Sequence, residues 1–227
     1  AVGGSSSQIL TLLIGFFTGV ASGAAVIVAQ YYGARDAEDS SRSVHTAMIL
    51  AIVSGAVMTV VGILTAPVLL RIMATPEDTM ADSIVYMRWV YLAMIPGMVY
   101  NMGSAILRAV GDSKHPLYFL IACCLINVVL DLLFVVTFKM GVAGAAVATA
   151  LSQLLSAVMV CWFLARPKTE ESVRLEISKL RTDWKLMRRT VHIGLPAGLQ
   201  AVLYSISNMI IITAVNRFGT DTAAAWV

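Results

Sequence analysis

The sequence contains few charged residues. Asp, Glu, Lys and Arg make up 13% of its 227 residues, about half of the ~25% typical of a soluble domain. Hydrophobic residues make up 59%. The charged residues are confined to short segments between long apolar runs, a pattern that indicates a polytopic, all-α membrane protein and excludes an ordinary soluble domain.

Cysteine and histidine are also scarce. The cysteines Cys123, Cys124 and Cys161 lie inside apolar runs with no zinc-site or disulfide spacing, which favours small buried residues. The three histidines lie at the ends of apolar runs. An intramembrane enzyme needs a paired acid, a Ser–His dyad or a metal cluster. Their absence from the predicted spans therefore argues against an enzyme, and we expect no cofactor.

The start of the sequence lacks an initiator methionine and a secretory signal pattern, a basic stretch followed by a short apolar core and a cleavage site. The last residues, DTAAAWV, are similar to the opening of another apolar helix. We expect the sequence to be a piece of a longer protein.

Six stretches are long and apolar enough to cross a bilayer, which takes about 20 residues. They are Ser7–Tyr32, Val44–Met73, Ser83–Leu107, Leu117–Phe138, Gly141–Ala165 and Val191–Asn216. A seventh begins near Thr222. In the third stretch, Pro96 predicts a kink or a gating hinge.

Lys and Arg are distributed unequally between the two sets of loops. Twelve fall in the loops after the first, third and fifth stretches, and four on the opposite side. By the positive-inside rule we expect loops 33–43, 108–116 and 166–190 to be cytoplasmic, in a bacterial or archaeal inner membrane. This distribution also accounts for the net charge of +3 without a nucleic-acid partner.

Two further patterns concern packing. Gly15, Gly19 and Gly23 form a small-xxx-small ladder, which favours close approach of another helix. In the long polar segment, Ile177, Leu180, Trp184 and Met187 recur at helical spacing, which is compatible with an amphipathic helix on the inner leaflet or with a linker between two bundles.

The acid Asp131 lies well inside the fourth apolar stretch, whereas the other twelve acids lie in loops or at helix ends. A central carboxylate costs about 2.5–3.5 kcal/mol to insert, so we expect it to face the interior of the bundle. Asn127 lies one turn away on the same face. In this setting the acid either binds a proton or binds a hard cation together with other oxygen atoms. Asn101 and Thr149, in two other stretches, are candidate oxygen donors. The alternative is a structural hydrogen bond.

Other polar residues lie within the stretches. They are candidates to line a substrate cavity, although an interhelical hydrogen bond is the commoner role for each. They are Gln30, Gln153, Gln200, Tyr204 and Asn208.

Four segments in succession resemble the multidrug and toxic compound extrusion (MATE) transporters. They are VIVAQYYGARDAEDSSRSVHTA, LRAVGDSKHPL, INVVLDLLFV and GVAGAAVATALSQ. Their order and spacing are similar to those of the family over nearly the whole chain. The later segment that begins IGLPAGLQAVLYS resembles the first helix of the second lobe of the family.

The resemblance implies twelve helices in two repeated lobes that enclose a V-shaped cavity. Residues 1–165 would form the N-terminal lobe without its first helix, 166–190 the interlobe linker, and 191–227 helix seven and the start of helix eight. It also implies that Asp131, Asn127, Asn101 and Thr149 form a proton or Na⁺ site. The AVLYSIS segment lacks the helix-seven glutamate of some branches, so the chain is similar to the DinF-like branch.

The resemblance therefore predicts a monomeric antiporter that exports organic, often cationic, compounds in exchange for H⁺ or Na⁺. A flippase of lipid-linked glycans, from the same wider superfamily, would need basic residues facing the cavity, and the stretches hold almost none. A purely structural subunit would not explain Asp131.

Overall fold

The computed structural model describes residues 2–72, 77–167, 169–176 and 182–216, and this part of the chain is helical with short connections. The helices are α1 (Val2–Gly33), α2 (Ala37–Ile72), α3 (Glu77–Leu92), α4 (Met94–Ala109), α5 (Lys114–Asp131), the π-helix η1 (Leu132–Thr137), α6 (Gly141–Ala165) and α7 (Trp184–Asn216).

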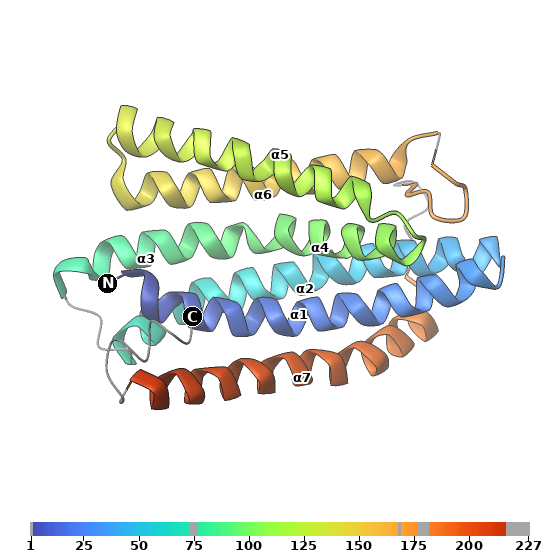
Figure 1. Cartoon of the computed structure of the whole chain (residues 1–227), viewed down its shortest axis with the longest axis horizontal. Helices are drawn as coiled ribbons and strands as arrows, with labels where there is room; N and C mark the ends of the chain where they lie inside the picture. Colours follow the sequence, from blue (N-terminus) through green and yellow to red (C-terminus); the bar gives the residue numbers. More distant parts are fainter. Residues whose placement is uncertain (1, 73–76, 168, 177–181, 217–227) are drawn as a thin grey trace.

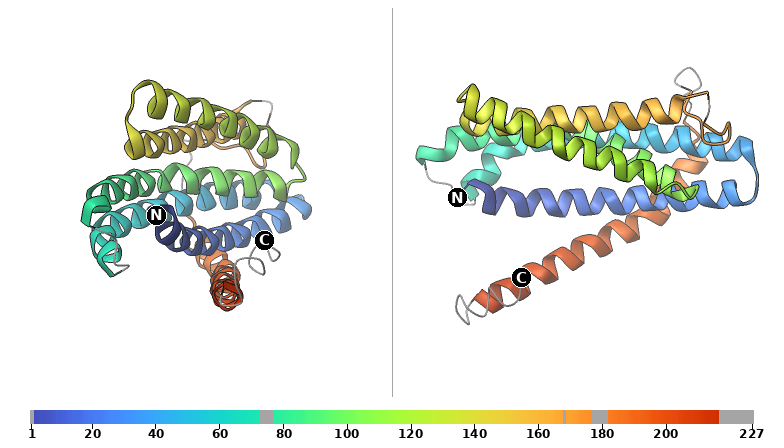
Figure 2. Two further views of the ribbon diagram at one scale, coloured as in Figure 1. Left: turned by 60° about the vertical axis from the view of Figure 1, so that its left-hand side comes forward. Right: turned by 45° about the horizontal axis from the view of Figure 1, so that its top comes forward.

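The helices form an elongated bundle (Figure 1). α4 contacts α1, α2 and α6, whereas α5 packs mainly against α6 and η1. The hairpin of α5 and α6 therefore forms one side of the bundle, and α7 lies on the opposite side against α1 (Figures 1 and 2). We call the end that carries residues 34–36, 110–113, 166–167, 169–176 and 182–183 the linker end.

Five helical segments are long and apolar enough to cross a membrane: Ile14–Gly33, Ala37–Val68, Ser83–Ala109, Lys114–Thr137 and Gly141–Ala165. They correspond to the first five predicted stretches, and the all-α prediction is confirmed. The sixth stretch belongs to α7, which begins at Trp184 instead of Val191 and is not among the five. The predicted start of another helix near Thr222 lies outside the described residues.

The predicted interruption at Pro96 is present. The third span is divided at Ala93 into α3 and α4, three residues before Pro96, because a proline has no N–H and its ring clashes with the carbonyl one turn earlier. The hydroxyl of Thr59 on α2 donates a buried 2.7 Å hydrogen bond to the carbonyl of Tyr91 beside the break. A side chain of α2 thus satisfies a backbone acceptor where the helix is interrupted.

The glycine ladder of α1 packs against α7. A Cβ on Gly23 would lie 2.5 Å from the backbone of Gly194, and one on Gly19 would overlap the backbone of Gly198. A Cβ on Gly15 would have ordinary contact, 3.7 Å, with Ala201. The two backbones therefore approach most closely at Gly19 and Gly23, and the predicted packing role of the ladder is confirmed.

Residues 169–176 of the linker dock on the bundle. Val173 and Leu175 are buried in the core with Met48 and Ile106, and the N–H of Leu175 donates to the carbonyl of Leu164. Of the segment expected to be amphipathic, 177–181 lies outside the described residues. Trp184 and Met187 belong to the first turns of α7, so this part of the pattern continues α7 instead of forming a separate surface helix.

Candidate functional site

One face of α5 packs against α6. The rings of Phe119 and Phe163 lie 5.7 Å apart, and the sulfur atoms of Cys123 and Met159 lie 3.9 Å apart. Continuing in steps of four residues from Phe119 and Cys123, the next positions are Asn127 and Asp131. The two polar residues therefore extend the apolar face that packs on α6.

Asn127 and Asp131 each carry a buried atom without a hydrogen-bond partner. The Asn127 Nδ2 and the Asp131 Oδ1 are the two atoms, one helical turn apart, and both residues are half-buried. Leaving a buried polar group unsatisfied costs about 1–3 kcal/mol, and more when the group is charged. The predicted interior placement of Asp131 thus agrees with the structure, whereas a structural hydrogen bond to Oδ1 is absent among the described residues.

Thr149 lies at the height of Asp131. The contacts of Phe119 and Cys123, and the approach of Phe134 to Gly144, define an antiparallel register between α5 and α6. That register sets Asp131 opposite residues 147–151, with Thr149 in the middle. The Thr149 hydroxyl donates to the carbonyl of Ala145, 2.9 Å away, so its lone pairs stay available to another partner.

Asn101 lies nearer the linker end. α4 and α6 run in the same direction, with Gly97 beside the side chain of Gln153 and Gly103 beside Val160. This register sets Asn101 about two turns, ~12 Å, from Thr149 along the bundle. Along the bundle axis, Asn127 lies nearer than Asp131 to the levels of Gln153 and Asn101. The structure therefore brings Asp131 and Thr149 to one level and separates Asn101 from them.

A π-helix begins directly after Asp131, which the sequence did not reveal. η1 continues α5 without a break in direction, and the N–H of Phe138 donates to the carbonyl of Leu133 five residues earlier. A Cβ on Gly144 of α6 would lie 3.1 Å from the backbone of Phe134. Short π-helical segments inside α-helices are frequent at functional sites, because they displace the side chains that follow.

The chemistry of this donor set is that of hard oxygen ligands. A carboxylate, an amide carbonyl and a hydroxyl suit a proton, or a cation such as Na⁺. Among the residues that the structure describes, no group of three or more His, Cys, Asp or Glu could hold a metal ion. A transition-metal centre thus has no ligand set in this part of the chain.

The other predicted cavity residues lie in different surroundings. The Gln30 Oε1 accepts a hydrogen bond from Arg189 on α7, which is the interhelical role considered above. Gln153 faces α4 at Gly97, and Gln200 and Tyr204 are exposed on α7. The side chain of Asn208 lies outside the described residues.

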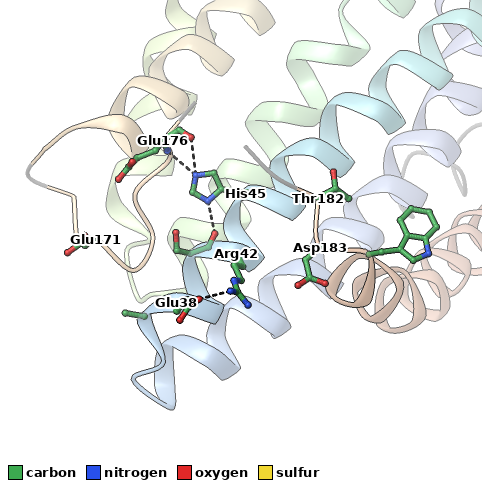
Figure 3. A pocket seen from close by; sticks show the side chains of 10 residues that line it. Glu38, Arg42, His45, Glu171, Glu176, Thr182 and Asp183 are labelled. Carbon is green, nitrogen blue, oxygen red and sulfur yellow. Dashed lines mark hydrogen bonds and ion pairs between the residues drawn. The ribbon is translucent and has the colours of Figure 1, made fainter. Parts of the chain in front are cut away.

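A second candidate is a pocket of about 790 Å³ at the linker end, between the start of α2, the linker and the start of α7 (Figure 3). Four of the charged residues that line it, Glu38, Arg42, Glu176 and Asp183, have partners. Arg42 pairs with Glu38, Arg174 pairs with Glu176 at 2.9 Å, and the Asp183 Oδ1 accepts the N–H groups of Lys185 and Leu186. These partners indicate a structural role, in contrast to the unpartnered atoms on α5.

His45 lines the same pocket and joins the linker to α2. Its Nδ1 lies 2.7 Å from the carbonyl of Ser41, and the N–H of Glu176 donates to Nε2 at 3.1 Å. Nε2 also lies 3.2 Å from the carbonyl oxygen of Glu176, so the ring bridges α2 and the linker. His45 is buried, so this contact fixes the linker at Glu176.

Sequence reasoning did not identify the contacts that α7 makes with α1. Arg189 donates to Gln30 and Tyr31, and Gly194 and Gly198 face the glycine ladder. The spacing of the two glycines in GLPAG was a visible small-xxx-small signal. No local pattern pointed to Arg189, because its partners lie more than 150 residues earlier in the chain.

Comparison with known proteins gives one family. The model of the MatE family matches residues 1–133. The chain is 31% identical over 220 residues to the probable multidrug resistance protein YoeA of Bacillus subtilis, which covers 95% of this chain and 48% of that protein.

Solved structures have the same fold. An outward-facing multidrug resistance MATE family transporter superimposes with a TM-score of 0.85 at 25% identity, over 95% of this chain and 47% of that one. An inward-facing transporter of the same family superimposes with a TM-score of 0.81 at 24% identity, over 96% of this chain and 49% of that one. The chain spans about half the length of the curated relatives that it matches.

Proposed function

The chain belongs to the MATE family, and from that premise we propose that it forms the ion-coupled part of an antiporter that exports organic compounds. It is a multi-pass membrane protein, and its relatives are transporters, not enzymes. The exported compounds are organic and often cationic, and the driving ion is H⁺ or Na⁺. Residues 1–165 act as one lobe, 166–190 as the linker, and 191–227 as the beginning of a second lobe.

A single observation carries this proposal: the carboxylate of Asp131 has a buried oxygen without a partner inside an apolar helix. A protein that used Asp131 only for packing would gain stability from a partner or from an apolar residue at this position. An oxygen that alternately holds and releases a small cation must, in contrast, lack a permanent partner.

In the proposed mechanism each polar side chain has a separate role. Asp131 supplies the negative charge, and Asn127 and Thr149 supply neutral oxygen atoms at adjoining levels. Asn101 contributes when α4 moves relative to α5 and α6. Binding of the cation removes the cost of the buried charge, so it favours a different packing of η1 and α5 against α6.

Coupling follows from differential affinity. The ion and the organic compound must stabilise different states of the same protein, because a ligand with equal affinity for both states shifts nothing. We assign the linker end to the cytoplasm of a bacterial or archaeal cell, because most Lys and Arg residues lie there. The ion then enters from the opposite end.

A flippase for lipid-linked glycans is the alternative in the same wider superfamily. Such a protein needs basic side chains to meet a pyrophosphate. Within the five membrane-spanning segments, the basic residues that lie away from the linker end reduce to Arg88, which is exposed. The polar groups of the α5–α6 face are therefore better suited to a cation.

Transport into vesicles tests the proposal. We expect uptake of a fluorescent organic cation by the complete transporter, driven by either a pH gradient or a Na⁺ gradient, and the two gradients are imposed separately. Asp131→Asn keeps the shape of the side chain and should reduce gradient-driven uptake at least ~100-fold. Full uptake by a folded Asp131→Asn protein would exclude this site as the coupling site.

A further inference from the structure

Arg189 on α7 connects two residues of α1. Its Nη2 donates to the Gln30 Oε1 at 3.1 Å, and its Nη1 donates to the Tyr31 hydroxyl oxygen at 3.3 Å. The guanidinium carbon also lies 5.9 Å from the centre of the Tyr31 ring. All three groups lie at the linker end, one to two turns beyond the glycine contacts of the same two helices.

The glycine contacts form a narrow crossing point. The approach is closest at Gly19 and Gly23 and loosens at Gly15, and α7 diverges from α1 away from the linker end (Figure 2, right). Because the two backbones approach most closely there, a tilt of α7 relative to α1 would turn about this crossing. The contacts of Arg189 oppose such a tilt because they lie to one side of the crossing.

The chemistry of these contacts suits a bond that opens and closes. Both acceptors are neutral, whereas a buried carboxylate would give a bidentate ion pair that costs several kcal/mol to break. Arg189 and Gln30 are also exposed to solvent, so water replaces the lost partners when the groups separate.

We propose that Arg189, Gln30 and Tyr31 form a latch that closes the linker end and that must open before the transporter takes up its substrate there. This inference rests on the proposed alternating-access function, in which α7 belongs to the second lobe. A second contact, from the N–H of Asp183 to the Thr46 hydroxyl, ties the start of α7 to α2.

A distance measurement across the linker end tests the latch without any transport assay. Spin labels are attached at Lys114 and Lys185, both exposed, in a cysteine-free background of the complete transporter. Arg189→Ala should raise the population with the longer distance about tenfold, because it removes two charge-assisted hydrogen bonds. Arg188→Ala is the matched control: Arg188 is an exposed neighbour on the same helix, and we expect no shift.

The opposite change strengthens the latch. Gln30→Glu turns a neutral acceptor into a carboxylate, so the longer-distance population should fall about tenfold, with a loss of the effect at high salt. In the Arg189→Ala background Gln30→Glu should have no effect. The latch is excluded if Arg189→Ala leaves the distances unchanged or if Arg188→Ala shifts them equally.

The distances also separate this inference from the proposed function. If Arg189→Ala shifts the distances while neither ion gradient drives uptake, the latch stands and the ion-coupled function is wrong. If the gradients drive uptake but Arg189→Ala has no effect on the distances, the function stands and the latch is wrong.

Discussion

Several ionisable groups at the linker end have hydrogen-bond partners, whereas the amide and the carboxylate in the middle of the α5–α6 hairpin each leave a buried atom without one. At the linker end, Tyr32 donates to Glu170 at 2.8 Å, His45 bonds to both α2 and the linker, and Asp112 accepts two bonds from His115. In the hairpin, the buried Asn127 Nδ2 and Asp131 Oδ1 lack partners.

The difference separates stability from function. Partnered groups near water hold loops and helix ends together, and each contributes about 1 kcal/mol or more. Unpartnered groups in an apolar helix oppose folding, so their presence calls for a ligand. Substitutions at the linker end should therefore change stability, and substitutions in the hairpin should change transport. Four predictions follow from the packing and hydrogen bonds of these regions and of the α1–α7 crossing, in order of their effect on the free energy of unfolding.

The largest effect is expected at the crossing of α1 and α7. Gly19→Ala places a methyl group against the backbone of Gly198, which cannot move without separating the helices. We expect a loss of about 3 kcal/mol, as for an overpacked core, measured by thermal unfolding in detergent. Gly33→Ala on the same helix is the control, since a Cβ atom at Gly33 would have no neighbour within 4 Å. An equal loss in both variants would contradict the close approach.

The contact between α2 and the linker should have the second largest effect. His45→Ala removes the hydrogen bonds to Ser41 and Glu176 and leaves a cavity, so we expect a loss of about 2 kcal/mol. Limited proteolysis should show faster cleavage near Glu176. His192→Ala, at an exposed position of α7, should change both measurements little, and similar losses in the two variants would argue against docking of the linker.

Some of these features were accessible from the sequence and others were not. The length of the apolar runs predicts the helices, because the thickness of a bilayer sets the length of a membrane-spanning helix. The cost of burying an acid predicts that Asp131 faces other helices. The docking of the linker depends on partners far away in the chain, such as Glu176 for His45. Trp184 and Met187 have the same periodicity in a separate surface helix and in the first turns of α7, so the sequence predicts a later start for this helix than Trp184.

The predicted ion site was accessible only in part. Asn127 follows from its position one turn before Asp131, since both lie on one helix. The height of Thr149 relative to Asp131 depends on the register of the hairpin, which the approach of Phe134 to Gly144 helps to set. The π-helix after Asp131 has no residue signature in LLFVVT. A π-helix differs from an α-helix in its backbone hydrogen bonds, whereas the same apolar side chains occur in both.

Replacing Asp131 in the hairpin and Asp112 at the linker end by leucine should have opposite effects on the free energy of unfolding. Asp131→Leu removes an unpartnered carboxylate and should raise the free energy of unfolding by about 1 kcal/mol while it abolishes ion-driven uptake. Asp112→Leu removes the partner of His115, 2.6 Å away, and should lower the free energy by a similar amount. Thermal unfolding of both variants, at the same pH and salt concentration, measures the two changes in stability. A loss of stability in Asp131→Leu would mean that this carboxylate holds the fold together.

Thr149 gives the smallest effect on stability and the most selective one on ion binding. Its hydroxyl donates only within its own helix, to Ala145, so Thr149→Val should change the free energy of unfolding by less than about 0.5 kcal/mol. The same change removes one oxygen at the height of Asp131, and the ion concentration for half-maximal uptake should rise about tenfold. Thr149→Ser keeps the oxygen and loses a methyl group, so it should retain the affinity for the ion. If Val and Ser raise that concentration equally, the methyl group and not the oxygen is what matters, and Thr149 would then pack against Asp131 without binding the ion.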